Sequence, residues 1–282
     1  MRHLEKIINW ANSIDSIKAL ILSGSLTGKG GQDILSDYDI AVYGNEFDFI
    51  ENDDWLNNIQ EYWVCIHEQF ELLGYEIPTR LTIFDAYFKV DFSFHPMEEL
   101  QKMIDEKIIP DDYNIGYEVL LDKGGFLKGL PKPVYKGFVS IKPDEKTFKE
   151  NVKEFWFECY HVAKYLFRND LWVAKTRDHA TKKFLLQMLE WNEACKRNLN
   201  FSPKDHGKQM DDWLDRKYWN ELHNCFGKFD KEDGWHALIN TIQLYETVAK
   251  ETAKFLEYGY DERLDEKIFQ FIKDLKSSSD GK

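Results

Sequence analysis

The chain has few cysteines and lacks a long apolar segment. Its 282 residues include four cysteines that form no Cys-x-x-Cys pair: Cys65, Cys159, Cys195 and Cys225. We therefore expect reduced, mostly buried thiols and no zinc site built from them. No apolar run approaches the roughly 20 residues of a membrane-spanning helix, so we expect no membrane contact. The first five residues do not begin a signal peptide, and the expected location is the cytoplasm.

Basic residues are scarce in the first half of the chain. Residues 1–140 contain 12 Lys and Arg against 24 Asp and Glu, whereas residues 141–282 contain 25 against 26. An acidic half is a poor surface for a nucleic-acid backbone, so we expect no nucleic-acid partner and favour a cationic one. The 43% hydrophobic and 15% aromatic content is typical of a globular protein, and the length allows two domains. The eight histidines show no His-Glu-x-x-His pattern, and no Ser-His-Asp arrangement can be singled out.

The most informative stretch runs from Leu20 to Tyr43. An apolar run predicts a buried strand that ends at Gly24-Ser25, and Asp37-Tyr38-Asp39 leads into a second apolar run. Alternation along a strand puts Asp37 and Asp39 on the same face. Two adjacent carboxylates repel each other unless a cation lies between them, and Mg²⁺ prefers such oxygen ligands and phosphate. The pattern therefore favours nucleotidyl or phosphoryl transfer, and the alternative is an acidic loop that follows a strand.

A second stretch, residues 79–95, contains an isolated carboxylate. Two alternating runs flank Asp85-Ala86 and predict a hairpin or tight meander. Asp91 lies in the middle of the second run, although Asp is depleted from strands. If this strand pairs beside the one that carries Asp39, Asp91 supplies a third carboxylate to the same site. The alternative is an exposed edge strand, or a salt bridge from Asp91 to Lys89 or Arg80.

The chain changes character near its middle. Residues 124–143 are rich in Gly and Pro, and we place a domain boundary there, with domains at 1–135 and 136–282. Before it, the patterns predict helices over 2–14, 55–59 and 96–104, and strands over 61–66 and 117–121. After it, helical spacing over 145–168, 171–194, 209–226, 232–257 and 262–276 predicts a helical bundle, in which 171–194 forms one helix or a helix pair.

In order and spacing, these motifs resemble the nucleotidyltransferase superfamily with the palm of DNA polymerase β. More closely, the chain resembles the bacterial aminoglycoside (streptomycin) 6-adenylyltransferases. The matching segments are Gly24-Ser25, Asp37-Tyr38-Asp39-Ile40, residues 52–57, Lys89-Val90-Asp91, Glu154-Phe155-Trp156 and residues 188–191. The resemblance implies an α+β fold, in which a palm-type mixed β-sheet with flanking helices forms the nucleotidyltransferase domain. A C-terminal helical bundle would then bind the acceptor.

The resemblance implies transfer of AMP from Mg·ATP to an aminoglycoside hydroxyl, with release of pyrophosphate. Asp37, Asp39 and Asp91 would hold Mg²⁺, and Gly24 and Ser25 would seat the β- and γ-phosphates of the nucleotide. Asp91 would also accept the proton of the acceptor hydroxyl, as a general base. The three carboxylates and the Gly-Ser pair support the same steps on physical grounds.

One position departs from the family pattern. Members often carry Arg directly after Gly-Ser, whereas this chain has Leu26, so a cation that faces the triphosphate is missing. Lys29, or the adjacent Lys182 and Lys183, would supply the charge, and Lys182 aligns with a basic residue of the family. The alternative for Lys182 is an ordinary solvated lysine.

A cationic acceptor needs carboxylates and aromatic faces. We propose that Glu154, Trp156 and Asp178 line the acceptor side of the site, with Glu158 one helical turn after Glu154. The alternative is that these acidic residues are solvated and that the tryptophan belongs to the core. The same active site is also compatible with another hydroxyl, on a small molecule, a protein or an RNA end. A further alternative is a non-enzymatic nucleotide-binding protein with this fold. The sequence does not indicate the oligomeric state.

Overall fold

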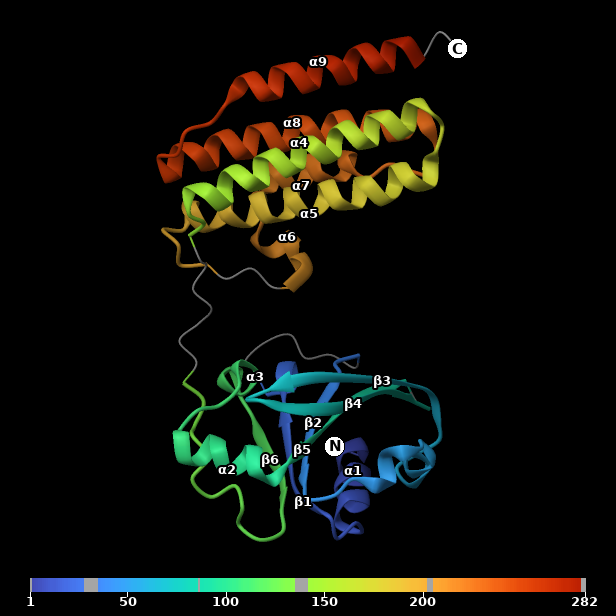
Figure 1. Cartoon of the computed structure of the whole chain (residues 1–282), viewed down its shortest axis with the longest axis vertical. Coiled ribbons are helices and arrows are strands. Elements are labelled where there is room, and N and C mark those ends of the chain that lie inside the picture. The colour runs from blue at the N-terminus through green and yellow to red at the C-terminus, as the bar shows by residue number, and fades with distance from the viewer. Residues whose placement is uncertain (1, 28–34, 86, 135–141, 202–204, 280–282) are drawn as a thin grey trace. The chain divides into compact units, whose positions relative to one another are not determined.

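The chain forms two compact units, which divide between residues 135 and 136. The computed structural model describes residues 2–27, 35–85, 87–134, 142–201 and 205–279. The first unit is built around a β-sheet, and the second is helical (Figure 1). The predicted α+β class, a mixed sheet with flanking helices followed by a helical region, is thereby confirmed. Within the described residues, no helix is both long and apolar enough to cross a membrane.

The first unit contains a six-stranded sheet in the order β3-β4-β5-β2-β1-β6 (Figure 1). Its strands are β1 (Ile17–Ser23), β2 (Tyr38–Gly44), β3 (Tyr62–Leu72), β4 (Tyr75–Phe84), β5 (Phe88–Pro96) and β6 (Glu118–Asp122). The pairing of β2 with β5 is parallel, and the other four pairings are antiparallel. Because β5 lies between β4 and β2, it is an interior strand, and the edge-strand alternative for Asp91 is wrong.

Each face of the sheet has its own apolar core because strand residues alternate between faces. Helix α1 (Arg2–Asn12) packs on one face, where Val90, Phe92 and Phe94 of β5 are buried. Helices α2 (Met97–Glu106) and α3 (Asp111–Ile115) cover part of the other face. The residues of β5 that alternate with the buried ones, including Asp91, belong to this second face.

The sequence patterns missed part of the hairpin formed by β3 and β4. Residues 61–66 predicted a short strand, but β3 continues to Leu72 and pairs with β4 along its length. The turn consists of Leu73 and Gly74, with φ values of 53° and 88°. Two positive φ values are typical of the tight turn whose twist matches that of a hairpin. The predicted helix over 55–59 is a short 3-10 helix, η3 (Asp54–Asn58).

The second unit is a set of helices around a single apolar core. Its helices are α4 (Glu145–Phe167), α5 (Leu171–Lys196), α6 (Met210–Trp213), α7 (Arg216–Leu222), α8 (Lys231–Leu256) and α9 (Glu262–Ser279). The long helices α4, α5, α8 and α9 agree with the predicted ranges. The prediction of one helix over 209–226 is wrong, because Leu214 has an extended backbone and the Asp215 side chain caps a new helix.

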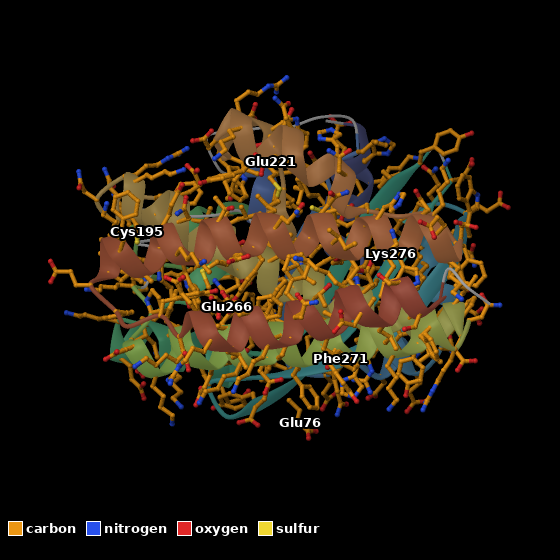
Figure 2. The ribbon with its side chains drawn as sticks, turned by 90° about the horizontal axis from the view of Figure 1, so that it is seen from above. Glu76, Cys195, Glu221, Glu266, Phe271 and Lys276 are labelled. Carbon is orange, nitrogen blue, oxygen red and sulfur yellow. The ribbon has the colours of Figure 1, made fainter. Side chains whose placement is uncertain are left out.

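Helix α9 packs along α4 with both polar and aromatic contacts. Phe271 of α9, labelled in Figure 2, stacks on Tyr160 of α4 with ring centroids 5.2 Å apart. Asp265 of α9 is 2% exposed and lies beside the Tyr260 hydroxyl and the Trp156 indole. Burial raises the pKa of Asp265 to about 6, against the stabilising effect of these two donors. Between about pH 4 and pH 6, this carboxyl is therefore mostly protonated in the folded unit and mostly ionised in the unfolded chain.

This shift predicts how the stability of the protein depends on pH. Because the folded pKa of Asp265 lies above the unfolded value of 3.8, the unfolded chain loses this proton first as pH rises. Asp265 therefore lowers the free energy of unfolding between about pH 4 and pH 6, by about 3 kcal/mol at most. We expect Asp265→Asn to remove this decrease, as measured by urea denaturation at several pH values.

A matched control separates the buried carboxyl from its helix. Asp274→Asn changes an exposed acid two turns later on α9, and we expect it to leave the pH dependence of the wild type unchanged. If Asp265→Asn and Asp274→Asn had the same stability profile between pH 4 and pH 7, the assigned role of Asp265 would be incorrect.

Candidate active site

Three neighbouring strands bring two acids and a turn together. Ser23 of β1 lies opposite Asp39 of β2 in the strand register, and Asp39 in turn lies opposite Asp91 of β5. These positions lie on the sheet face that α2 and α3 partly cover, since Ala41 and Tyr43 continue it along β2. The pairing places the Asp91 carboxylate next to Asp39, as alternation and strand neighbourhood predicted. The site is thus built from residues that are far apart in the sequence.

Asp37 joins this cluster from outside the strand. The prediction that Asp37 and Asp39 both lie on one strand is wrong, because β2 begins at Tyr38 and Asp37 immediately precedes it. The Asp37 carboxylate still reaches the cluster through Lys89, whose ammonium donates to Asp37 Oδ2 at 2.8 Å and to Asp91 Oδ2 at 2.8 Å. Lys89 therefore bridges Asp37 and Asp91, while Asp39 lies opposite Asp91 in the strand register.

The charges in this cluster do not balance. Burial raises the pKa of Asp39 to about 6, and the negative charges of Asp91 and Asp37 add to the effect, while Lys89 opposes it. Burial alone would lower the Lys89 pKa, but its hydrogen bonds and ion pairs with Asp37 and Asp91 raise it above the usual value. One ammonium therefore neutralises only part of the charge of three carboxylates.

The end of β1 turns directly against Asp39. Gly24 has a φ of +73° and begins the short 3-10 turn η1 (Gly24–Leu26). A Cβ atom at Gly24 would lie 1.9 Å from Asp39 Oδ2, so glycine is required by conformation and by space. The Thr27 hydroxyl donates to the Gly24 carbonyl at 2.9 Å, which stabilises the turn. Ser25 lies within this turn, and its side chain and Lys29 are outside the described structure.

The donor set of the cluster fits a divalent cation. Asp91 Oδ1 is buried and has no hydrogen-bond partner, so a further ligand is needed to satisfy it. All candidate ligands are carboxylate oxygens, which suit Mg²⁺ better than softer metals. Asp37, Asp39 and Asp91 would hold such an ion, which would offset carboxylate charge that Lys89 alone leaves unbalanced.

The same face continues away from the carboxylates as a buried hydrogen-bond chain. His95 Nε2 lies 2.8 Å from Ser93 Oγ, and His95 Nδ1 lies 2.7 Å from Glu99 Oε2. The sequence did not single out this chain, because its members are common residues at ordinary spacing. His95 and Glu99 are buried, and the chain fastens the first turn of α2 to β5 beside the candidate site.

Among the described residues, the ligand atoms of Asp53, Cys65 and His67 lie within 4.8 Å of one another, a spacing that Asp37, Asp39 and Asp91 do not reach. The Asp53 carboxylate already lies 2.9 Å from His67 Nε2 and 3.7 Å from Arg80 Nε. Arg80 is buried, so its positive charge opposes a divalent cation beside Asp53. We interpret this group as an ion-pair cluster.

The predicted residues of the helical unit have different surroundings. Lys182 is largely buried and its ammonium pairs with Asp178 Oδ1 at 2.6 Å, so it is not an ordinary solvated lysine. Trp156 is fully buried in the helical core, and its proposed place on the acceptor surface is wrong. Glu154 is exposed, whereas Glu158 is buried and pairs with Arg177 at 3.1 Å. The helix α4 therefore presents no joint carboxylate pair at positions 154 and 158.

The sheet and its carboxylate cluster define the class of protein, a nucleotidyltransferase. Residues 1–275 match the family model for streptomycin adenylyltransferase. The chain belongs to this family.

Two curated relatives are similar over nearly the whole chain, and both are named aminoglycoside 6-adenylyltransferase. The one from Bacillus subtilis (strain 168) is 26% identical over 286 residues, covering 98% of this chain and 97% of the relative. The one from Campylobacter jejuni is 26% identical over 275 residues, covering 94% and 92%. A crystal structure of an aminoglycoside 6-adenyltransferase from Bacillus subtilis covers 98% of each chain, at 22% identity and a TM-score of 0.47.

Proposed function

We propose that this protein transfers AMP from Mg·ATP to a hydroxyl of an aminoglycoside such as streptomycin and releases pyrophosphate. The family supports the class of reaction, and one observation carries the proposal. That observation is the register in which Asp39 pairs with both Ser23 and Asp91, so that two acids and the Gly24 turn meet on one sheet face. The acidic character of residues 1–140 is consistent with a cationic acceptor.

Asp37, Asp39 and Asp91 would hold Mg²⁺. When bound, the ion would neutralise phosphate charge and orient the attacking and leaving oxygens. The Gly24 turn lies against Asp39 and lets the backbone approach the nucleotide phosphates closely, since no side chain intervenes. In this arrangement the protein contributes mainly position and charge, as in phosphoryl transfer generally.

Asp91 would accept the proton of the acceptor hydroxyl. With one carboxylate oxygen on the ion, the other would accept the hydroxyl proton. Lys89 now engages Oδ2, and Oδ1 is buried without a hydrogen-bond partner. Lys182 and Asp178 neutralise each other in the helical unit, and we do not assign either to the nucleotide or to the acceptor. Glu154 remains a candidate for contact with the cationic acceptor because its carboxylate is exposed.

One assay tests the function directly. Purified protein is incubated with Mg·ATP and each member of an aminoglycoside panel, and pyrophosphate release is measured with and without EDTA. We expect release that depends on the metal and is fastest with streptomycin. Release with none of these compounds would contradict the aminoglycoside assignment. Release of pyrophosphate only with another hydroxyl compound or with a protein would identify a different acceptor and would leave the nucleotidyltransferase assignment in place.

Asp91→Asn tests the role of the base. We expect turnover to fall by about 100-fold or more, because the acceptor proton loses its carboxylate, and we expect the KM for ATP to change less than turnover does. Steady-state kinetics with varied ATP and varied acceptor separate these parameters. A variant that alters only the KM for ATP would show that Asp91 is not the base.

A further inference from the structure

Lys89 occupies a position that the proposed function assigns to another cation. Its ammonium lies 2.8 Å from Asp37 Oδ2 and 2.8 Å from Asp91 Oδ2. Both oxygens belong to the acids that would hold Mg²⁺. Alternation along β5 places Lys89 and Asp91 on one face, so this contact is fixed by the strand itself.

A divalent ion bound at these two oxygens would lie within repulsive distance of this ammonium. Mg²⁺ binds oxygen at about 2.1 Å, and an ammonium in the same gap would be held beside it with strong repulsion. About a third of the Lys89 side chain is exposed, and its flexible stem allows the ammonium to leave. Binding of the ion therefore favours the exchange of Lys89 to another partner.

The exchanged ammonium needs a new anion, and the nucleotide provides one. Mg²⁺ would bind together with the nucleotide, whose phosphates would offer the released ammonium new anionic partners. The described turn η1 contains no cation, since Leu26 follows Gly24 and Ser25, and Lys29 lies outside the described residues. Among the described residues, Lys89 is the cation that forms ion pairs with the acids of this cluster.

We propose that Lys89 is an exchangeable counter-ion. It neutralises Asp37 and Asp91 when no metal is bound, and it pairs with a phosphate oxygen when the metal–nucleotide complex binds. This inference deepens the proposed function and rests on its nucleotide site, but it does not depend on the acceptor. Lys89 would thereby provide the phosphate contact that, by the family resemblance, an Arg directly after Gly-Ser provides, at the position where this chain has Leu26.

The proposal predicts opposite effects of Lys89→Gln on two affinities. Without nucleotide, removal of the competing ammonium should strengthen Mn²⁺ binding by about tenfold, because two carboxylates become available. With nucleotide, loss of the phosphate contact should weaken binding of a non-hydrolysable ATP analogue with Mn²⁺ by about tenfold. A residue with a merely structural role would weaken both.

The experiment measures free Mn²⁺ by electron paramagnetic resonance, first with protein alone and then with the non-hydrolysable ATP analogue. Lys18→Gln is the matched control. It removes one positive charge from β1, five residues and about 17 Å from Ser23, and we expect both affinities to stay within about twofold of wild type. Lys89→Arg keeps the charge, and we expect bare Mn²⁺ affinity within about threefold of wild type.

Opposite changes in Lys89→Gln, absent from Lys18→Gln, would support the exchange. Weaker binding of bare Mn²⁺, or unchanged binding of the Mn²⁺–nucleotide complex, would overturn it. If Lys89→Gln fails to fold, Lys89→Arg still tests the proposal. Tighter binding of bare Mn²⁺ by that variant would contradict competition between the positive side chain and the metal ion. Because no acceptor is present, failure of the aminoglycoside assay leaves this test unaffected, and each proposal can fail separately.

Discussion

Asp39→Asn is expected to lower turnover by about a thousandfold or more while the protein remains folded. Asp39 is the central acid of the cluster, since it pairs in register with Ser23 on one side and Asp91 on the other. An amide at this position loses the negative charge that a metal–nucleotide complex requires. The measurement is pyrophosphate release with the best acceptor of the wild-type protein.

The same substitution is expected to stabilise the metal-free protein. Burial and the charges of Asp91 and Asp37 raise the pKa of Asp39 to about 6, so its ionised form is unfavourable in the folded state near neutral pH. Replacing it by a neutral isostere should increase the free energy of unfolding by about 1–3 kcal/mol at pH 7. A gain in stability that accompanies a loss of activity is typical of a functional residue.

Asp85→Asn provides the control for Asp39→Asn. Asp85 is exposed in the connection between β4 and β5, and its replacement removes the same charge from the same unit. We expect normal turnover and a change in unfolding free energy within about 0.5 kcal/mol. Full activity in Asp39→Asn would rule out the proposed metal site.

Gly24→Ala is expected to have the second largest effect. At a φ of +73°, alanine costs about 1 kcal/mol or more relative to glycine. Its Cβ would also lie 1.9 Å from Asp39 Oδ2, so either the turn or the Asp39 carboxylate must move. Because small displacements of catalytic groups are costly, we expect turnover to fall by about 100-fold.

Gly125→Ala separates backbone strain from the contact with Asp39. Gly125 has a φ of +72°, nearly that of Gly24, but a Cβ atom there would meet nothing within 4 Å. Both variants should lose comparable stability from strain, whereas only Gly24→Ala should lose activity. Thermal unfolding and the pyrophosphate assay on both proteins provide the comparison. Unchanged turnover in Gly24→Ala would remove the Gly24 turn from the active site.

Local patterns predicted the elements that form the site. Alternation separated Asp91 from Val90 and Phe92, and the structure buries the apolar residues on one face as expected. The long helices were also predictable, because an amphipathic repeat is a property of a contiguous segment. The helix predicted over 209–226 failed because Asp215 caps α7, and a local side-chain hydrogen bond then competes with helix continuation.

The surroundings of the residues proposed for the acceptor were harder to predict for a physical reason. Helix α4 packs against α5, α8 and α9, so its buried surface extends beyond a single stripe. The sequence around Trp156 does not reveal this, because burial depends on the number of neighbouring helices. For the same reason the pairing of Glu158 with Arg177, and of Lys182 with Asp178, became apparent only from the packed unit.

By itself the sequence determined that Lys89 and Asp91 share one face of a strand. It also determined that a glycine turn follows one apolar strand and that a pair of acids leads into the next. These are properties of a few consecutive residues, and backbone geometry is sufficient to fix them. Only the tertiary structure decided that β2 lies parallel to β5 with Asp39 opposite Asp91, and that the Lys89 ammonium also reaches Asp37. Strand order and register depend on the burial of both sheet faces at once, so contacts between distant segments had to form before the acids could meet.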